Sequence, residues 1–341
     1  MQFLKYFFLV IFLGIWVIAL SPELSSKMTA GDSYRYGDLY RLSNLSNFKD
    51  PRKECGEYKK PAFPSNSKKV HLYIIGDSFT EKQRVSKKDF AIDAYTYVKW
   101  SEVLHVKPDT SEINILLLES VERHFREKFA KNPIQNIVPD SATFVTNSNN
   151  PTFMNKLDDA FRSKSLEGRL DEVLFQNDFV LALKQLKADF NYKVFNRVNK
   201  EVTSINGGKD IVYYMDTDTD TSKTTSSFSE IEKAEIDSMV YYLNQTQKIA
   251  LKIGFDQVIL SIIPNKVSVL MPSYGTYNQL ISRIYSHPNF RLSYIDVYED
   301  FRKMGSKSYL KGDSHWTCEA QYLWLNKSNA MVNQLAAKPI L

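Results

Sequence analysis

The 341-residue chain has little of several residue types from which common functional sites are built. It contains two cysteines and five histidines, and these form no cluster with the spacing of a zinc site. It has no glycine-rich phosphate loop and no recognition-helix pattern, and its net charge of +5 is small. We therefore expect no metal, no cofactor and no nucleic-acid partner.

The remaining composition is that of an ordinary globular protein, with 43% hydrophobic and 24% charged residues. At this length the chain can bury one large core, or one core with a substantial insertion. The 20 tyrosines and 21 phenylalanines are many, and we expect most of them to pack in that core.

The N-terminus carries one long apolar run, from Tyr6 to Leu20. With Phe3 and Leu4 this run approaches the ~20 residues that span a bilayer. A signal peptide cleaved near Ser21 is the competing interpretation. The aromatic residues of the run, and Lys5, which can snorkel to the headgroups, favour an uncleaved anchor. Either interpretation places the rest of the chain outside the cytoplasm.

The segment from Val70 to Thr80 begins with an apolar stretch rich in β-branched and aromatic residues. Such a composition is typical of a strand buried in a parallel sheet. The stretch stops at Gly76, where a sharp turn would present Ser78 at the carboxyl end of the strand. Ligand sites of open α/β sheets lie beyond those ends, so Ser78 is a candidate nucleophile. Alternatively, Asp77 and Ser78 form an ordinary turn or a helix cap.

A second motif, Asp313-Ser314-His315-Trp316, lies near the other end of the chain. A serine hydroxyl reacts when a neighbouring base takes its proton, and that base needs an orienting partner. In an extended segment, Asp313 and His315 point to the same side, so the carboxylate can hold the imidazole Nδ1–H. Only His315, among the histidines, combines a nearby acid with a loop position before a plausible helix.

Together these motifs resemble the SGNH/GDSL hydrolase superfamily, with Gly76-Asp77-Ser78 as its first block and Asp313-Ser314-His315 as its last. The Asp-x-His-Trp motif is closer to the branch of alginate and related polysaccharide O-acetyltransferases. Residues 114–123, 263–266 and 293–297 also look like that branch, and the resemblance covers roughly residues 68 to 335.

The resemblance implies an acetyl group, a secreted polysaccharide as acceptor and a polytopic membrane acyltransferase as donor partner. Ser78 would be the nucleophile, His315 the base and Asp313 the carboxylate that stabilises the imidazolium. A carbohydrate esterase of the same superfamily and a non-catalytic polysaccharide-binding or assembly protein are the alternatives. Typical members complete the oxyanion hole from two middle blocks that cannot be placed here. Asn114 and Asn265 match only in residue type.

Several other residues are expected to support the site or bind substrate. Glu119 and Arg123 are four apart, which predicts a shared helix face and an ion pair, or a role for Arg123 in fixing a loop or binding the acyl donor. Trp316 is expected either to stack on a sugar ring or to anchor its loop in the core. The full set of supporting candidates is Asp77, Arg123, Trp316, Asn265 and Lys266.

Three further features have alternative readings. The basic stretch of Lys82, Arg84, Lys87 and Lys88 is expected to be solvated surface, or else to attract an acidic polymer. Cys55 and Cys318 form either one bridge or two buried thiols. The segment 216–220 resembles a calcium loop but lacks its glycine and glutamate, and we interpret it as a polar loop.

Alternating strand and helix patterns predict an α/β fold, an SGNH-like parallel sheet flanked by helices with an inserted segment and an N-terminal anchor. Gly254 fits a helix stop and Thr317 a helix cap. The predicted strands are 70–75, 113–118, 211–215, 258–263 and 291–297, and the predicted helices are 121–129, 170–190, 229–253 and 317–337. The predicted regions are an anchor or signal segment (1–21), a linker (22–67) and a catalytic domain (68–338) with an insertion at about 132–227.

Overall fold

The computed structural model describes residues 2–28, 36–51, 55–62, 68–140, 154, 164–220 and 222–337. The chain divides into two compact units. The larger comprises Lys53–Ala142 and Thr203–Leu341, and the smaller comprises Met1–Arg52 and Thr143–Val202.

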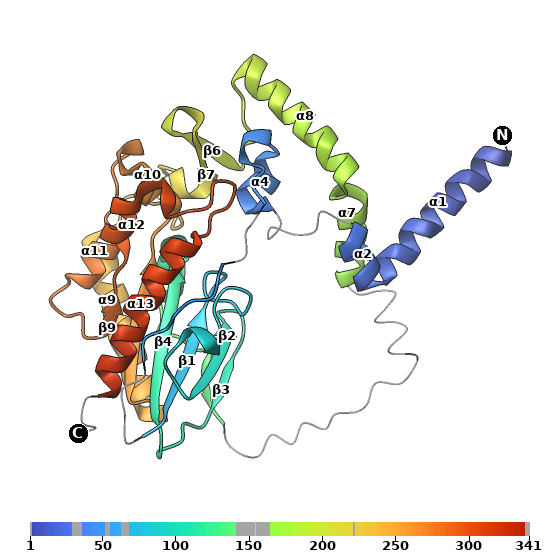
Figure 1. Ribbon diagram of the computed structural model, residues 1–341. Helices are drawn as coiled ribbons and strands as arrows, with labels where there is room; N and C mark the ends of the chain where they lie inside the picture. The colour runs from blue at the N-terminus through green and yellow to red at the C-terminus, as the bar shows by residue number, and fades with distance from the viewer. Residues whose placement is uncertain are drawn as a thin grey trace. The chain divides into compact units, whose positions relative to one another are not determined.

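The larger unit is built on a five-stranded parallel sheet of order β2-β1-β4-β8-β9 (Figure 1). The runs of valine, isoleucine and leucine in its three central strands are almost wholly buried, as expected of a parallel sheet covered on both faces. The five strands are β1 (Val70–Gly76), β2 (Ala94–Lys99), β4 (Ile113–Val121), β8 (Gln257–Ile263) and β9 (Ser293–Ile295).

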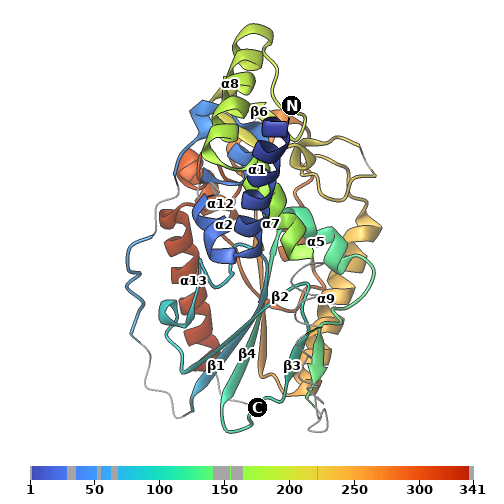
Figure 2. The same ribbon diagram turned by 90° about the vertical axis from the view of Figure 1, so that its right-hand side faces the viewer.

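Helices cover both faces of this sheet, and Figure 2 shows α13 and α9 on opposite sides of it. Leu72 and Ile74 of β1 pack in one core cluster with Trp324 of α13, whereas Tyr73 and Ile75 pack in another with Met239 of α9. The predicted α/β class with a parallel sheet flanked by helices is therefore confirmed. The covering helices are α5 (Glu122–Phe129), α9 (Lys233–Ile253) and α11 (Leu280–Tyr285) on one side and α12 (Tyr298–Met304) and α13 (Cys318–Ala336) on the other.

Most predicted strands and helices of this unit occur within a few residues of their expected bounds. Helix α9 ends at Gly254, whose φ of 119° lies in the left-handed region that glycine tolerates. Thr317 caps α13 by accepting a hydrogen bond from the Ala320 N–H. Strand β4 runs on to Val121, beyond its predicted end, because Glu119 to Val121 still pair with β8.

Some elements of the larger unit were not predicted. Edge strand β2 is only half buried and lacks the apolar run of the central strands. Two small sheets pair β3 (Leu104–Val106) with β5 (Ile137–Pro139), and β6 (Val202–Ile205) with β7 (Asp210–Tyr213), and of these four strands only β7 was predicted, at 211–215. A short helix, α10 (Lys266–Leu270), follows β8.

The smaller unit is helical. Among the described residues, only α1 is long and apolar enough to cross a membrane, and nearly all of it is exposed. The predicted helix 170–190 is split in two, because the Asn177 side chain caps a new helix by accepting from the Val180 N–H. The helices are α1 (Gln2–Leu20), α2 (Pro22–Met28), α4 (Asp38–Ser43), α7 (Lys164–Phe175) and α8 (Asp178–Phe195).

The predicted linker 22–67 is not without regular structure. It contains α2 and α4 in the smaller unit, where Leu39, Tyr40 and Phe48 are buried. Further along, Cys55 forms a disulfide with Cys318 in the larger unit. Of the two states that the sequence left open for these cysteines, the bridge is the one present, and it joins this segment to the start of α13.

Candidate active site

Ser78, His315 and Asp313 form a continuous hydrogen-bonded relay. The Ser78 Oγ lies 2.7 Å from the His315 Nε2, and the His315 Nδ1 lies 2.5 Å from the Asp313 Oδ1. Ser78 and His315 are 237 positions apart in the chain. The contact predicted from the two sequence motifs is therefore present, and it has the geometry of a nucleophile, a base and an orienting acid.

The sheet topology explains why this relay lies where it does. The chain leaves β1 for β2 on one side and later returns to β4 on the other side of β1. The carboxyl ends of β1 and β4 thus border a point at which the strand order reverses, where open α/β sheets bind ligands. Ser78 follows directly after β1 at this point.

Asp313 is held as a carboxylate. Its burial alone would raise its pKa, but hydrogen bonds from His315, the charge of that ring and the charge of Arg84 outweigh burial, so the pKa falls below its ordinary value of 3.8. The His315 N–H also donates to Asp313 Oδ1, at 3.0 Å. An ionised Asp313 can fix the imidazole tautomer and stabilise an imidazolium.

The prediction that the basic stretch after Ser78 is solvated holds for three of its four members. Lys82, Lys87 and Lys88 are exposed. Arg84 is buried instead, lies 3.5 Å from Glu81 and contributes its charge to the surroundings of Asp313. The carboxylate of Glu81, three residues earlier in the chain, compensates the charge of the buried Arg84 guanidinium.

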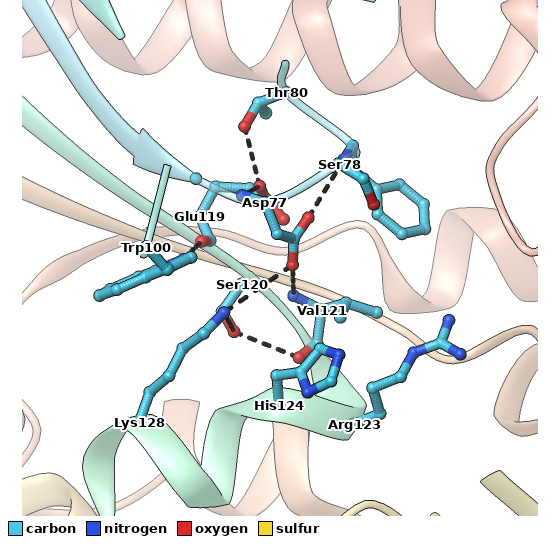
Figure 3. A network of polar contacts seen from close by, with 12 residues as sticks. Asp77, Ser78, Thr80, Trp100, Glu119, Ser120, Val121, Arg123, His124 and Lys128 are labelled. Carbon is cyan, nitrogen blue, oxygen red and sulfur yellow. Dashed lines mark hydrogen bonds and ion pairs between the residues drawn. The ribbon is translucent and has the colours of Figure 1, made fainter. Parts of the chain in front are cut away.

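The turn that carries Ser78 is tied to the end of β4 by two carboxyl groups (Figure 3). The Asp77 side chain accepts from the Val121 N–H at 2.8 Å and from the Phe79 N–H at 3.1 Å. Glu119 Oε2 accepts from the Asp77 N–H at 2.9 Å and from the Thr80 hydroxyl at 2.8 Å. Asp77 is thus a structural support of the turn.

Glu119 is fully buried in this network. Burial, and then the negative charge of Asp77, raise the pKa of Glu119 well above 4.5. Lys128 Nζ lies 3.9 Å from Asp77 Oδ2 and donates to Ser120 Oγ, and burial lowers its pKa (Figure 3). Lys128 was not identified from the sequence, where it has the pattern of a surface helix position, and Glu119 was assigned to Arg123 instead of to the turn.

The predicted Glu119–Arg123 ion pair is wrong. Glu119 belongs to β4 and Arg123 to α5, so the two side chains do not share a helix face. Arg123 lies 3.4 Å from Asp216, with its guanidinium 5.6 Å from the centre of the Tyr213 ring. Asp216, expected in a polar loop, is fully buried against it.

Asn265 and Lys266 both act as internal supports. Asn265 Oδ1 accepts from the Arg123 N–H at 3.1 Å, and its Nδ2 donates to Ser227 Oγ at 2.9 Å. Lys266 is 1% exposed. Its ammonium donates to the carbonyls of Leu310, Lys311 and Asp313, at 2.8, 3.0 and 3.2 Å. It therefore fixes the loop that carries Asp313 and His315.

Trp316 has one of its two expected roles, and Asn114 does not lie at the site. Trp316 is 2% exposed and packs against the rings of Phe79 and Trp324, so it anchors its loop in the core and is not placed to stack on a sugar. Asn114 lies at the amino end of β4, opposite to Ser78, and its Nδ2 donates to the Asp109 carbonyl. Asn114 is thus excluded as an oxyanion-hole donor.

A cavity of about 650 Å³ lies beside the segment that leads into Asp313. Tyr309 closes one wall, and its hydroxyl donates to the Pro264 carbonyl at 2.6 Å. The lining residues are Asn206, Lys209, Asp210, Ser306, Tyr309 and Lys311. Its hydrogen-bonding side chains of both charges suit a polar ligand.

Comparisons of the chain with protein-family models, with curated proteins and with solved structures found no match.

Proposed function

We propose that this protein is an extracytoplasmic Ser-His-Asp acyl-transfer protein that O-acetylates a secreted or cell-surface polysaccharide. The observation that carries the proposal is the relay of Ser78, His315 and Asp313, with contacts of 2.7 and 2.5 Å. The Ser78–His315 contact falls within the range in which a base can take the proton of a serine nucleophile, and the His315–Asp313 contact orients that base.

In the proposed reaction, Ser78 Oγ attacks the acyl carbonyl while His315 Nε2 takes its proton. The imidazolium, stabilised by Asp313, then protonates the departing alcohol, and an acyl ester remains on Ser78. A sugar hydroxyl next attacks this ester as its proton passes to Nε2, and Ser78 finally recovers that proton. The Ser78 N–H donates no hydrogen bond to a described residue and is a candidate donor to the oxyanion.

The choice of substrate class and family rests on the sequence motifs together with the fold. The Gly-Asp-Ser block follows the first strand of a parallel sheet and the Asp-Ser-His-Trp block precedes the last helix, in the order of the SGNH/GDSL superfamily. The acetyl group, the polysaccharide and a polytopic membrane acyltransferase as donor partner follow from the resemblance to the O-acetyltransferase branch.

Two observations support a location outside the cytoplasm. The exposed apolar helix α1 is compatible with a membrane anchor or a signal segment. The Cys55–Cys318 disulfide is typical of proteins folded in an oxidising compartment.

The test is acetyl transfer from a chromogenic ester, measured with and without an oligosaccharide acceptor. Ser78→Ala and His315→Ala should each lower kcat by at least ~10⁴-fold, and the double variant should be little worse than either. His105→Ala is the matched control, because His105 is exposed on β3 and should leave the rate unchanged.

The same assay separates the alternatives. Release of acetate at an equal rate with and without acceptor, with no acetylated sugar, would identify an esterase. Activity that survives Ser78→Ala would refute the mechanism. A wild-type chain without acyl-transfer activity, and full polysaccharide modification in cells that carry Ser78→Ala, would instead indicate a binding or assembly protein.

A further inference from the structure

Helix α8 of the smaller unit presents a stripe of large apolar side chains to solvent. Their spacing of three or four residues places them on one face of the helix. Each is more than half exposed, between 52% and 73%, which is unusual for side chains of this size. The members of this apolar stripe are Phe179, Leu183, Leu186, Phe190 and Val194.

The opposite face of α8 is held inside the unit, which fixes the direction of the stripe. Leu181 is buried, Gln185 Oε1 accepts from the Tyr40 hydroxyl at 3.1 Å, and Asp189 Oδ1 accepts from the Ser46 N–H at 3.0 Å. The face of α8 that carries Leu181, Gln185 and Asp189 therefore packs against the rest of the smaller unit, and the apolar stripe faces away from it.

A cationic cavity of about 750 Å³ lies alongside the stripe. Lys184 and Lys187 of α8 line it together with Arg41 and Arg197, and Glu201 is its single carboxylate. None of these four cations forms an ion pair with a described residue. These four cations thus lie close together around one cavity, and burial, together with the nearby charge of Arg41, lowers the pKa of Lys184. An anion is the ligand that would relieve this repulsion.

We infer that α8 lies in the interfacial layer of an anionic phospholipid membrane, with the apolar stripe among the acyl chains and lipid phosphates in the cationic cavity. An apolar face flanked by lysine and arginine is the pattern of helices that lie in the plane of a membrane surface. Residues 178–200 contain five lysines or arginines and two aspartates, a net charge of +3. That charge favours anionic over neutral lipid.

The rest of the smaller unit favours lipid over a soluble protein as the occupant. Helix α1, the candidate membrane span, packs on α7, and Arg169 Nε of α7 donates to the Ala19 carbonyl at 2.6 Å. Helix α8 begins three residues after α7 ends. A bilayer that holds α1 would thus be close to α8, and phospholipid supplies the acyl chains and the phosphate in one molecule.

The experiment places an environment-sensitive fluorophore on Leu186→Cys in the full chain, whose two native cysteines are engaged in the disulfide. The labelled chain is reconstituted into vesicles of phosphatidylcholine, with or without phosphatidylglycerol. We expect blue-shifted emission and quenching by acyl-chain-brominated lipid, both stronger with phosphatidylglycerol. Leu251→Cys on α9, an exposed leucine outside the stripe, is the matched control and should not respond to lipid composition.

A second variant tests the cavity. Lys184→Gln combined with Lys187→Gln should raise the phosphatidylglycerol content needed for half-maximal quenching at residue 186 by at least twofold, with helicity unchanged by circular dichroism. A label at residue 186 that stays open to an aqueous quencher in both vesicle types would overturn the proposal. So would equal burial in neutral and anionic vesicles, or burial only in native membranes, which would indicate a protein partner.

Discussion

Glu119 accepts two hydrogen bonds from the turn that carries Ser78, yet it does not touch the relay itself. Because it is buried and lies near Asp77, its pKa is raised well above 4.5. The folded chain thus holds this proton more tightly than the unfolded chain. The resulting stabilisation is complete below pH 4.5 and is lost as the pH rises through the folded pKa.

Glu119→Gln should remove this pH dependence. The amide oxygen can accept the same two hydrogen bonds and carries no charge at any pH. The free energy of unfolding of the wild type should therefore fall, relative to that of the variant, as the pH rises above 4.5. Urea titrations at a series of pH values would measure it, with Glu127→Gln, at a side chain 74% exposed, as the control. Parallel pH profiles for wild type and Glu119→Gln would contradict the assignment.

Among the structural elements, the turn between β1 and Ser78 depends on the absence of a side chain at Gly76. A Cβ added there would lie 2.0 Å from Thr80 Oγ1 and 2.9 Å from Glu119 Oε2. Both atoms belong to the bonds that hold the turn to β4. A larger residue must therefore shift the Thr80 and Glu119 side chains and disturb the hydrogen bond between them, which supports the turn that carries Ser78.

Gly76→Ala should destabilise the larger unit by about 1–3 kcal/mol, the usual effect of overpacking, and should lower acyl-transfer activity as well. The matched control is Gly168→Ala on α7, where nothing lies within 4 Å of the added Cβ. That change should be neutral or mildly stabilising, because alanine favours a helix over glycine. Thermal unfolding and the acetyl-transfer assay would report both effects. Full activity in Gly76→Ala would show that the turn tolerates displacement.

The loop that carries Asp313 is held in place by the hydrogen bonds that Lys266 donates to its carbonyls. Lys266→Met keeps most of the side-chain volume but leaves three carbonyls without their ammonium donor. A buried polar group left without its partner costs about 1–3 kcal/mol, so stability should fall by at least that amount. We expect kcat to fall more than KM rises, because the loop orients the base. Lys248→Met, at an exposed position on α9, should change neither quantity.

For the molecule as a whole, the Cys55–Cys318 bridge spans a sequence separation of 263 residues within the larger unit. Replacing both cysteines by serine should lower the free energy of unfolding by about 2–4 kcal/mol, since the unfolded chain gains freedom. Guanidinium titrations would measure the loss, and reductant should shift only the wild type. Because Lys266 and Trp316 still hold the loop, activity well below the melting temperature should persist. A variant that is folded but inactive would show that the bridge also positions His315.

Patterns that depend on neighbouring residues were predictable from the sequence. The apolar runs predicted β1 and β8, Gly254 predicted the end of α9, and Asp313 with His315 predicted their mutual contact. In each case the decisive residues lie within a few positions of one another, so backbone periodicity or spacing is sufficient.

Features that depend on distant partners could not be predicted in this way. Glu119 meets Asp77 across 42 positions, and Lys266 meets the carbonyls of its loop across 44 to 47. Trp316 and Asp216 both carry polar groups, and both are buried because other elements of the fold pack over them. The spacing of Phe179, Leu183 and Leu186 is visible in the sequence, but their exposure is not. Local chemistry sets which elements form, whereas burial, ion pairing and charge state depend on which distant segments the topology brings together.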